Sequence, residues 1–252
     1  MKPRMNLEQL ILTGLLTALI TAVTIVIAIP IPFTNGYVHP GDSMIFMAAL
    51  ILGRRRGAFA AGLGSALADV ILGYFIWAPF TFVIKGVMAF LTGFIIEKCA
   101  EKPRNLVFSC AFVAGLWFAF NAAAVGVTLY AAGAGGSITN AIELRTMWAA
   151  LLVPAALILI AAVLRRKENI AVPPAHIVGM TGGGLFMVFG YYVAGGLIYG
   201  NFTAALLGMP ANIAQFAGGF LIAALLSAAL QNTSAKRYFV YNSKKAETGK
   251  TL

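Results

Sequence analysis

The sequence predicts an all-α protein, a polytopic bundle of transmembrane helices. Of its 252 residues, 60% are hydrophobic and only 10% are charged, whereas soluble domains carry about 25% charged residues. Several apolar runs approach or exceed the roughly 18–20 residues that span a bilayer. The 27 glycines favour close helix packing in lipid, where small residues let backbones approach one another.

The N-terminal segment is predicted to form the first transmembrane helix, over residues 7–29. Its basic start could suggest a signal peptide, but the apolar core of such a peptide is only about 7–15 residues long. Here the apolar run is longer and stops at Pro30 and Pro32. A polar loop, FTNGYVHPGD, follows at residues 33–42.

The rest of the chain divides into seven further apolar segments. Three arginines at residues 54–56 separate the second segment from the third, and Ala78-Pro79 makes the turn before the fourth. The short second segment is bounded by glycines, and interrupted spans are typical of transport sites. The seven segments cover residues 42–52, 57–77, 80–96, 106–131, 147–164, 177–199 and 211–230.

The basic residues cluster on one predicted side of the membrane. The net charge is +10, and 16 of the 18 Lys and Arg residues fall in the N-terminus, three loops and the tail. This asymmetry is the positive-inside pattern, and it argues against nucleic-acid binding. We therefore expect about eight spans with both termini cytoplasmic. Residues 1–235 would form one transmembrane domain, and 236–252 a basic, poorly ordered cytoplasmic tail.

Two ionisable residues, Asp69 and Lys85, lie inside apolar segments, where charges are costly and usually functional. Small residues recur every four positions on the face that carries Asp69, at Gly57, Ala61 and Ser65, so this face is expected to point inward. Counted from the predicted helix ends, Asp69 lies about 12 Å and Lys85 about 9 Å deep. The two residues could form a structural ion pair, a ligand site or a gate, and all three readings stay open.

Polar and aromatic residues gather toward the same predicted outer side. Asn212 and Gln215 are three residues apart and share a helix face, so their amides could read the edge of a small heterocycle while aromatic rings stack on its face. For the tyrosines and Trp77, the alternative is an interfacial aromatic belt. The candidate substrate-binding residues are His39, Asp42, Asp69, Tyr74, Trp77, Lys85, Tyr191, Tyr192, Asn212 and Gln215, and Tyr199 belongs to the same cluster.

The sequence contains no recognisable set of catalytic residues. It has two histidines and neither an HExxH motif nor a Cys/His cluster, which argues against a metal hydrolase. Gly249-Lys250-Thr251 resembles the end of a phosphate-binding loop, but Lys244 stands where that loop requires glycine. We expect no catalytic residue, no metal site and no cofactor.

Small residues also recur every four positions on the first helix, at Gly14, Ala18 and Ala22. Such a stripe forms a groove suited to close contact with another helix. Packing against the protein's own helices and contact with a separate partner are both compatible with the pattern.

Three stretches of the chain together resemble a known family. They are HPGDSMIFMAALILG, then GAFAAGLGSALADVILGYFIWAPFTFVIKG, then MVFGYYVAGGLIYGNFTAALLGMPANIAQFAGGFLIAALL. They resemble the substrate-binding (S) subunits of energy-coupling factor (ECF) vitamin transporters, in the riboflavin-transporter-like subfamily. The resemblance covers residues 7–98 and 176–230.

The resemblance implies a six-helix core that binds a vitamin or vitamin precursor from outside the cell. It implies a multi-pass protein of the cell membrane, expected to be a bacterial plasma membrane. The implied partners are a transmembrane coupling subunit and two cytoplasmic ATPase subunits, with release of the ligand by toppling. Gly14, Ala18 and Ala22 would contact the coupling subunit, and residues 34–42 would form a lid over the ligand.

Two features depart from the family pattern. Residues 106–166 resemble an extra helical hairpin inserted into the six-helix core, and Gly195 stands where many relatives carry an acidic residue. Pyridoxine, hydroxymethylpyrimidine, pantothenate and riboflavin all stay open as ligands. The alternative function is an autonomous secondary transporter that uses Asp69 and Lys85 for ion coupling.

Overall fold

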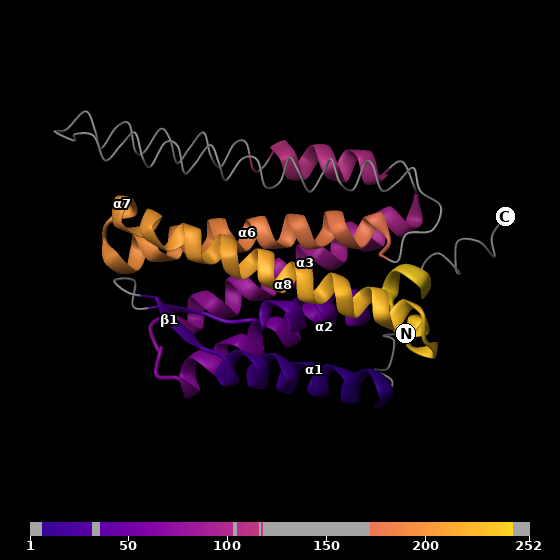
Figure 1. Cartoon of the computed structure of the whole chain (residues 1–252), viewed down its shortest axis with the longest axis horizontal. Coiled ribbons are helices and arrows are strands. Elements are labelled where there is room, and N and C mark those ends of the chain that lie inside the picture. Colours follow the sequence, from indigo (N-terminus) through magenta and orange to yellow (C-terminus); the bar gives the residue numbers. More distant parts are fainter. Residues whose placement is uncertain (1–6, 32–35, 103–104, 116, 118–171, 244–252) are drawn as a thin grey trace, which may run out of the picture.

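The computed structural model describes residues 7–31, 36–102, 105–115, 117 and 172–243, which form a bundle of long helices with one short β-hairpin (Figure 1). Apolar residues dominate every long helix. The helical hydrogen bonds satisfy the backbone N–H and C=O groups, as a membrane requires. In chain order the elements are α1 (Leu7–Val26), β1 (Ile29–Ile31), β2 (Gly36–Val38), α2 (Asp42–Ile71), α3 (Ala78–Glu101), an apolar helix (Asn105–Gly115), α6 (Pro174–Tyr199), α7 (Phe202–Ala205), the 3₁₀ helix η1 (Leu206–Gly208), α8 (Met209–Gln231) and the 3₁₀ helix η2 (Ser234–Tyr238).

Within the described residues, four helical stretches are long and apolar enough to cross a membrane. They are α1, α3, α6 and Leu206–Gln231. This composition agrees with the predicted helical membrane bundle. Most of the predicted inserted hairpin, residues 106–166, lies outside the described residues, so the expected count of about eight spans stays a prediction.

The chain reverses direction inside α2, at Gly53. This residue has φ 73° and ψ −177°, a backbone conformation that is essentially restricted to glycine. The two arms of α2 lie side by side, because a Cβ on Gly57 would come within 2.9 Å of the Cα of Ala49. The predicted segments 42–52 and 57–77 are therefore two arms of one helical hairpin, and the three arginines follow its turn.

The second arm of α2 ends earlier than predicted. The helix stops at Ile71, six residues before the predicted end at Trp77. Gly73 then takes a positive φ of 85°, and glycine commonly ends a helix in this way because it carries no Cβ. Asp69 is consequently close to the end of its helix, which changes its depth in the bundle.

α3 packs between α2 and α6, while α1 covers α2, and α8 contacts both α2 and α6. The close approach of α3 and α6 depends on Gly183, where a Cβ would lie 2.5 Å from the carbonyl oxygen of Met88. Glycine at this position lets the two backbones meet, as in other membrane helix pairs.

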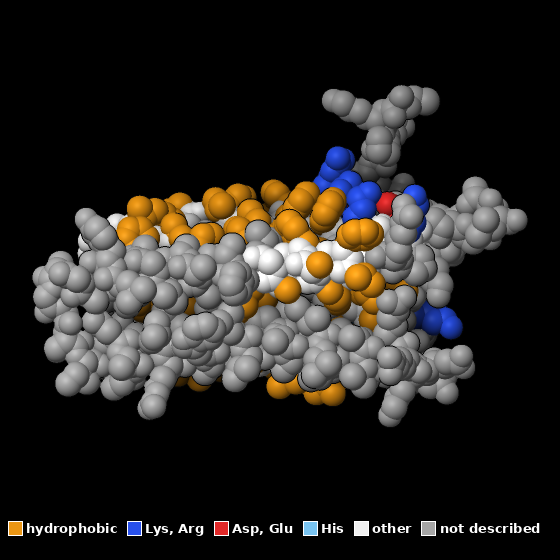
Figure 2. Space-filling view, turned by 90° about the horizontal axis from the view of Figure 1, so that it is seen from above, with side chains coloured by type: hydrophobic (Ala, Val, Ile, Leu, Met, Phe, Trp, Pro, Cys, Tyr) orange, Lys and Arg blue, Asp and Glu red, His pale blue; other side chains and the backbone are white. Residues whose placement is uncertain are grey.

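Basic side chains gather at one end of the bundle. α1 begins and α8 ends at the same end (Figure 1). Figure 2 shows Lys and Arg side chains collected at that end, while the described side chains along the length of the bundle are mostly hydrophobic. This distribution agrees with the positive-inside pattern, and the cytoplasmic location of that end stays a prediction.

The segment after α8 folds back onto the basic end of the bundle. Phe239 is fully buried, and its ring stacks on that of His176 with centroids 5.7 Å apart. Val240 reaches the turn of α2, 3.3 Å from the position of a Cβ on Gly53. The prediction of a poorly ordered tail is therefore wrong for residues 236–243, because two apolar side chains anchor this otherwise polar stretch.

We expect Gly53→Ala to destabilise the protein more than Gly73→Ala. Both glycines have positive φ, so each substitution introduces about 1–3 kcal/mol of backbone strain. A Cβ on Gly53 would also lie 2.9 Å from Oε1 of Glu97, which accepts the Arg54 amide hydrogen at 3.1 Å. A Cβ on Gly73 would have no atom within 4 Å. Thermal unfolding in detergent measures both variants, and equal melting temperatures would contradict this prediction.

Candidate ligand-binding site

A cavity lies between the β-hairpin and the helix ends opposite the basic end of the bundle. Its volume is about 60 Å³, whereas pockets that hold small-molecule ligands measure roughly 300–1,000 Å³. The cavity in this structure is therefore smaller than a typical ligand pocket. The lining residues are Ile31, Gly36, Tyr37, His39, Asp69, Tyr74, Trp77, Thr81, Tyr191, Gly195, Tyr199, Ala205, Gly208, Asn212 and Gln215.

Most of the predicted substrate-binding residues line this cavity, namely His39, Asp69, Tyr74, Trp77, Tyr191, Asn212 and Gln215. Three do not. Asp42 and Lys85 are fully buried outside the cavity lining, and Tyr192 packs edge-on against Phe202 with ring centroids 5.8 Å apart. Consecutive residues of a helix point about 100° apart, so Tyr191 faces the cavity and Tyr192 faces away from it.

The buried ion pair beside the cavity joins Lys85 to Asp42. Nζ of Lys85 donates to Oδ1 of Asp42, and both side chains are completely buried. Nζ also lies 5.1 Å from the centroid of the Tyr191 ring, within the range of a cation–π interaction. Of the three readings left open for Asp69 and Lys85, the structural ion pair between them is therefore wrong, because Lys85 pairs with Asp42 instead.

The depths of the three residues explain this difference. The observed helix ends at Ile71, so Asp69 lies only about 3 Å from its end, while Lys85 lies about 10 Å into α3. Asp42 is 11 residues from the turn at Gly53, and Asp69 is 16 residues from it. Asp42 is consequently about 8 Å deeper than Asp69, at a level that Lys85 can reach.

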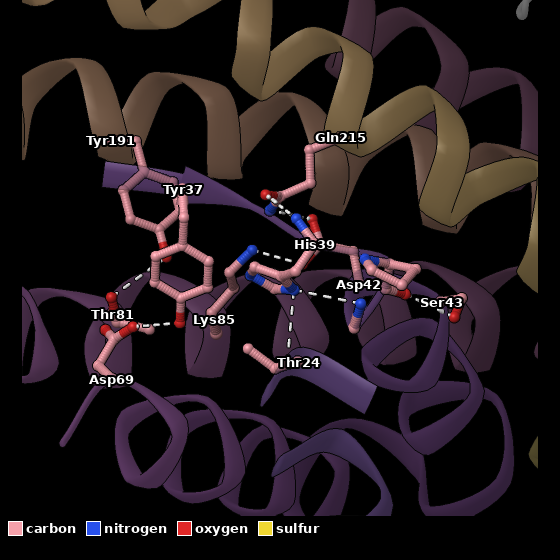
Figure 3. A network of polar contacts seen from close by, with 12 residues as sticks. Thr24, Tyr37, His39, Asp42, Ser43, Asp69, Thr81, Lys85, Tyr191 and Gln215 are labelled. Carbon is pink, nitrogen blue, oxygen red and sulfur yellow. Dashed lines mark hydrogen bonds and ion pairs between the residues drawn. The ribbon is translucent and has the colours of Figure 1, made fainter. Parts of the chain in front are cut away.

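Gln215 of α8 connects this ion pair to the chain segment that precedes α2 (Figure 3). Its Nε2 donates to Oδ2 of Asp42 at 3.0 Å, and its Oε1 accepts the backbone N–H of His39 at 3.1 Å. Both oxygens of the Asp42 carboxylate thus have a donor. A buried carboxylate needs such donors to offset the loss of hydration.

His39 is held as a neutral imidazole. Its Nδ1 accepts the Gly41 amide hydrogen at 3.1 Å and lies 3.4 Å from Oγ1 of Thr24. Burial lowers the pKa of His39 to about 3, and the ammonium of Lys85 adds to the effect. Because Nδ1 is an acceptor, Nε2 carries the ring hydrogen. The imidazole therefore has one hydrogen-bond donor at neutral pH.

Asp69 accepts a hydrogen bond from the β-hairpin. The Tyr37 hydroxyl donates to Oδ1 of Asp69 at 2.6 Å. Burial raises the pKa of Tyr37, and the carboxylate of Asp69 raises it further, so the phenol keeps its hydrogen. Oδ2 of Asp69 is buried with no hydrogen-bond partner among the described residues. The Thr81 hydroxyl lies near this carboxylate and contacts Oη of Tyr191 at 3.2 Å.

Aromatic rings in two groups line the cavity. Tyr37 and Tyr74 pack together with centroids 4.7 Å apart and planes tilted by 35°. Trp77 lies 5.9 Å from Tyr191 and 6.1 Å from Tyr199. Such aromatic rings offer faces on which a flat ring can stack.

Three polar side chains of the lining are absent from the predicted substrate-binding residues: Tyr37, Thr81 and Tyr199. Tyr199 belongs to the predicted outer cluster, and Tyr37 lies in the predicted polar loop, so both carried a signal. Thr81 carried none, because a single threonine near a helix start is common in any bundle.

Within the part of the chain that the structure describes, no three His, Cys, Asp or Glu side chains could hold a metal ion.

A second hollow, an apolar groove, lies between α1 and the second arm of α2. Gly14, Ala18 and Ala22 are all exposed, and a Cβ on Gly14 would have no atom within 4 Å. The stripe is therefore not packed against the protein's own described helices. The groove has a volume of about 590 Å³ and is lined by Leu10, Thr13, Gly14, Thr17, Ala18, Thr21, Ala22, Ile25, Phe59, Leu63 and Leu67.

We expect the loss of either member of the Asp42–Lys85 pair to destabilise the protein by about 3–5 kcal/mol, because a buried charge is left unpaired. Asp42→Asn leaves the ammonium without its counter-ion, and Lys85→Met leaves the carboxylate without one. The double variant D42N/K85M should lose less stability than the sum of the single variants, since neither charge remains. Denaturant unfolding in detergent measures all three variants. Additive losses would show that the two residues do not interact.

Comparisons with known proteins agree with this architecture. A family model described as "ECF-type riboflavin transporter, S component" matches residues 4–164, which include most of the predicted insertion at 106–166. An "Uncharacterized protein in gap 3'region" of Pyrococcus woesei is 39% identical over 121 residues, 48% of this chain and 78% of that protein. No solved structure matches the chain. The chain belongs to the family of ECF-type riboflavin transporter S components, which are membrane-embedded substrate-binding subunits of transporters and not enzymes.

Proposed function

We propose that this chain captures riboflavin, or a vitamin or precursor with a similarly flat ring, from outside the cell. Delivery to the cytoplasm would involve a transmembrane coupling subunit and two cytoplasmic ATPase subunits. The observation that carries the proposal is the cavity lined by aromatic side chains. It is supported by the description of the family as riboflavin transporter S components. We further propose a plasma-membrane location with about eight spans and both termini cytoplasmic.

The cavity wall offers both stacking surfaces and polar groups for such a ligand. Tyr74 and Trp77 both line the cavity and supply ring faces to it, each paired with another aromatic ring. Gln215 is already bonded through both its amide oxygen and its amide nitrogen, so it orients the wall. Asn212 lines the cavity on the same helix. We propose that its amide forms hydrogen bonds with the polar edge of the ligand.

The segment before α2 is the part of the wall that we expect to move. Of the predicted lid, the structure describes residues 36–42, and Gly36, Tyr37 and His39 of this segment line the cavity. The present volume of about 60 Å³ is too small for a vitamin. Ligand entry therefore requires this segment to shift away from the helices.

The groove on α1 is the surface that we assign to the coupling subunit. It is apolar, about 590 Å³ in volume, and floored by the small residues Gly14, Ala18 and Ala22. In lipid there is no hydrophobic gain from covering such a groove, so close backbone approach is the main source of attraction. A partner helix with a complementary ridge fits this requirement.

We expect the purified protein to bind riboflavin without ATP and without any partner. A panel of riboflavin, pyridoxine, hydroxymethylpyrimidine and pantothenate, tested by isothermal titration calorimetry in detergent, identifies the ligand. Stacking and hydrogen bonding in a closed site favour submicromolar affinity. We therefore expect one compound to give a saturable binding heat with one ligand per protein. Uptake into liposomes by this protein alone, driven by a proton or sodium gradient, would contradict the proposal and favour a secondary transporter.

We expect Ala18→Phe to abolish assembly with the coupling subunit while ligand affinity stays within about twofold of the wild type, because the bulky ring fills the groove. The matched control is Leu15→Phe, since Leu15 is an exposed residue of α1 that does not line the groove. Co-purification of the tagged subunits from a membrane that contains the whole transporter measures assembly. Equal loss of assembly in both variants would contradict the assignment of the groove.

A further inference from the structure

We propose that the phenol ring of Tyr37 occupies the subsite that receives the ring of the ligand. The ligand class is a flat heteroaromatic ring with an N–H or O–H donor on its edge, and that donor replaces the Tyr37 hydroxyl on Asp69. This inference rests on the proposed function, because it concerns the same cavity.

The contacts of Tyr37 are those that such a ring would make. Its ring faces Tyr74 with centroids 4.7 Å apart and His39 with centroids 5.3 Å apart. Its hydroxyl donates to Oδ1 of Asp69 at 2.6 Å (Figure 3). One side chain therefore uses both a stacking face and a buried anionic acceptor of the cavity.

Asp69 has acceptor capacity that the described residues do not use. The residue is 3% exposed, and its Oδ2 is buried without a well-aligned hydrogen-bond partner among them, although the Thr81 hydroxyl lies near the carboxylate and contacts Tyr191. Lys85 is bonded to Asp42 instead of Asp69. A buried acceptor without a donor is costly, and a ligand with a second donor would satisfy it. A ligand that presented a carboxylate here would instead bring two negative charges together.

Tyr37 also has weaker structural support than the aromatic lining residues on the helices. The rings of Trp77 and Tyr191 are fixed at the start of α3 and in the middle of α6. Tyr37 lies on a strand of three residues that pairs with one other strand, opposite Pro30. Proline has no N–H to donate, and a two-stranded hairpin alone is marginally stable. The Tyr37 ring can therefore leave while the helical walls stay in place.

The first test is riboflavin affinity of the full-length protein and of two variants that each remove one cavity tyrosine. Tyr37→Ala should bind about fivefold to tenfold more tightly, because the ligand no longer has to displace the occupant of its subsite. Tyr199→Ala should bind more weakly, because it removes a fixed wall. Asp69→Asn should bind more weakly as well, because the anionic acceptor is lost. Unchanged or weaker binding by Tyr37→Ala would overturn the proposal and make Tyr37 a contact of the bound ligand.

The second test needs no vitamin and uses p-cresol, which has the chemistry of the tyrosine side chain. We expect p-cresol to raise the melting temperature of Tyr37→Ala but not that of the wild type. Toluene, which lacks the hydroxyl, should have a smaller effect, and the double variant Y37A/D69N should respond equally weakly to both compounds. Equal effects on Tyr37→Ala and the wild type would overturn the subsite. If p-cresol stabilises Tyr37→Ala while no variant binds any vitamin, the subsite stands and the proposed function fails.

Discussion

The ion pair between Asp42 and Lys85 is the interaction on which the arrangement of the site depends. Two charges with no exposed surface are stable only if every remaining polar atom finds a partner. Gln215 supplies the second donor to Asp42 and in turn accepts the amide hydrogen of His39. The pair therefore fixes α2, α3 and α8 relative to one another, together with the segment that precedes α2.

This pairing also decides the chemistry of Asp69. If Lys85 had paired with Asp69, the carboxylate at the cavity would be neutralised and satisfied. Because Asp42 takes the ammonium at a deeper level, Asp69 stays available as an acceptor at the cavity wall and is reached by Tyr37. If Asp69 binds the ligand as proposed above, the support of the bundle and the recognition of a ligand belong to different carboxylates of the same helical hairpin.

Within the described residues, the sequence predicted the presence of the helical segments and the inward orientation of Asp69, because both follow from local periodicity. Ser65 and Asp69 are indeed both buried, as the spacing of small residues implied. The partner of Lys85 was not predictable in the same way, since it depends on depth, and depth depends on where a helix ends. A helix end at Ile71 rather than Trp77 requires the positive φ of Gly73, and glycine occurs too often in this chain to mark that point. The position of Tyr37 depends on strand pairing across the loop, which leaves no periodic signal in so short a hairpin.

α1 connects the groove and the cavity through its two faces. Ala22 lies on the exposed groove face, and Thr24, two residues later, is fully buried. Oγ1 of Thr24 lies 3.4 Å from Nδ1 of His39, and a Cβ on Gly41 would come within 2.1 Å of the same oxygen. With so little space, a shift of this end of α1 would press on His39, whose backbone N–H donates to Gln215. If the groove binds the coupling subunit, as proposed above, binding there would act on the segment that carries Tyr37 without contact with the cavity itself.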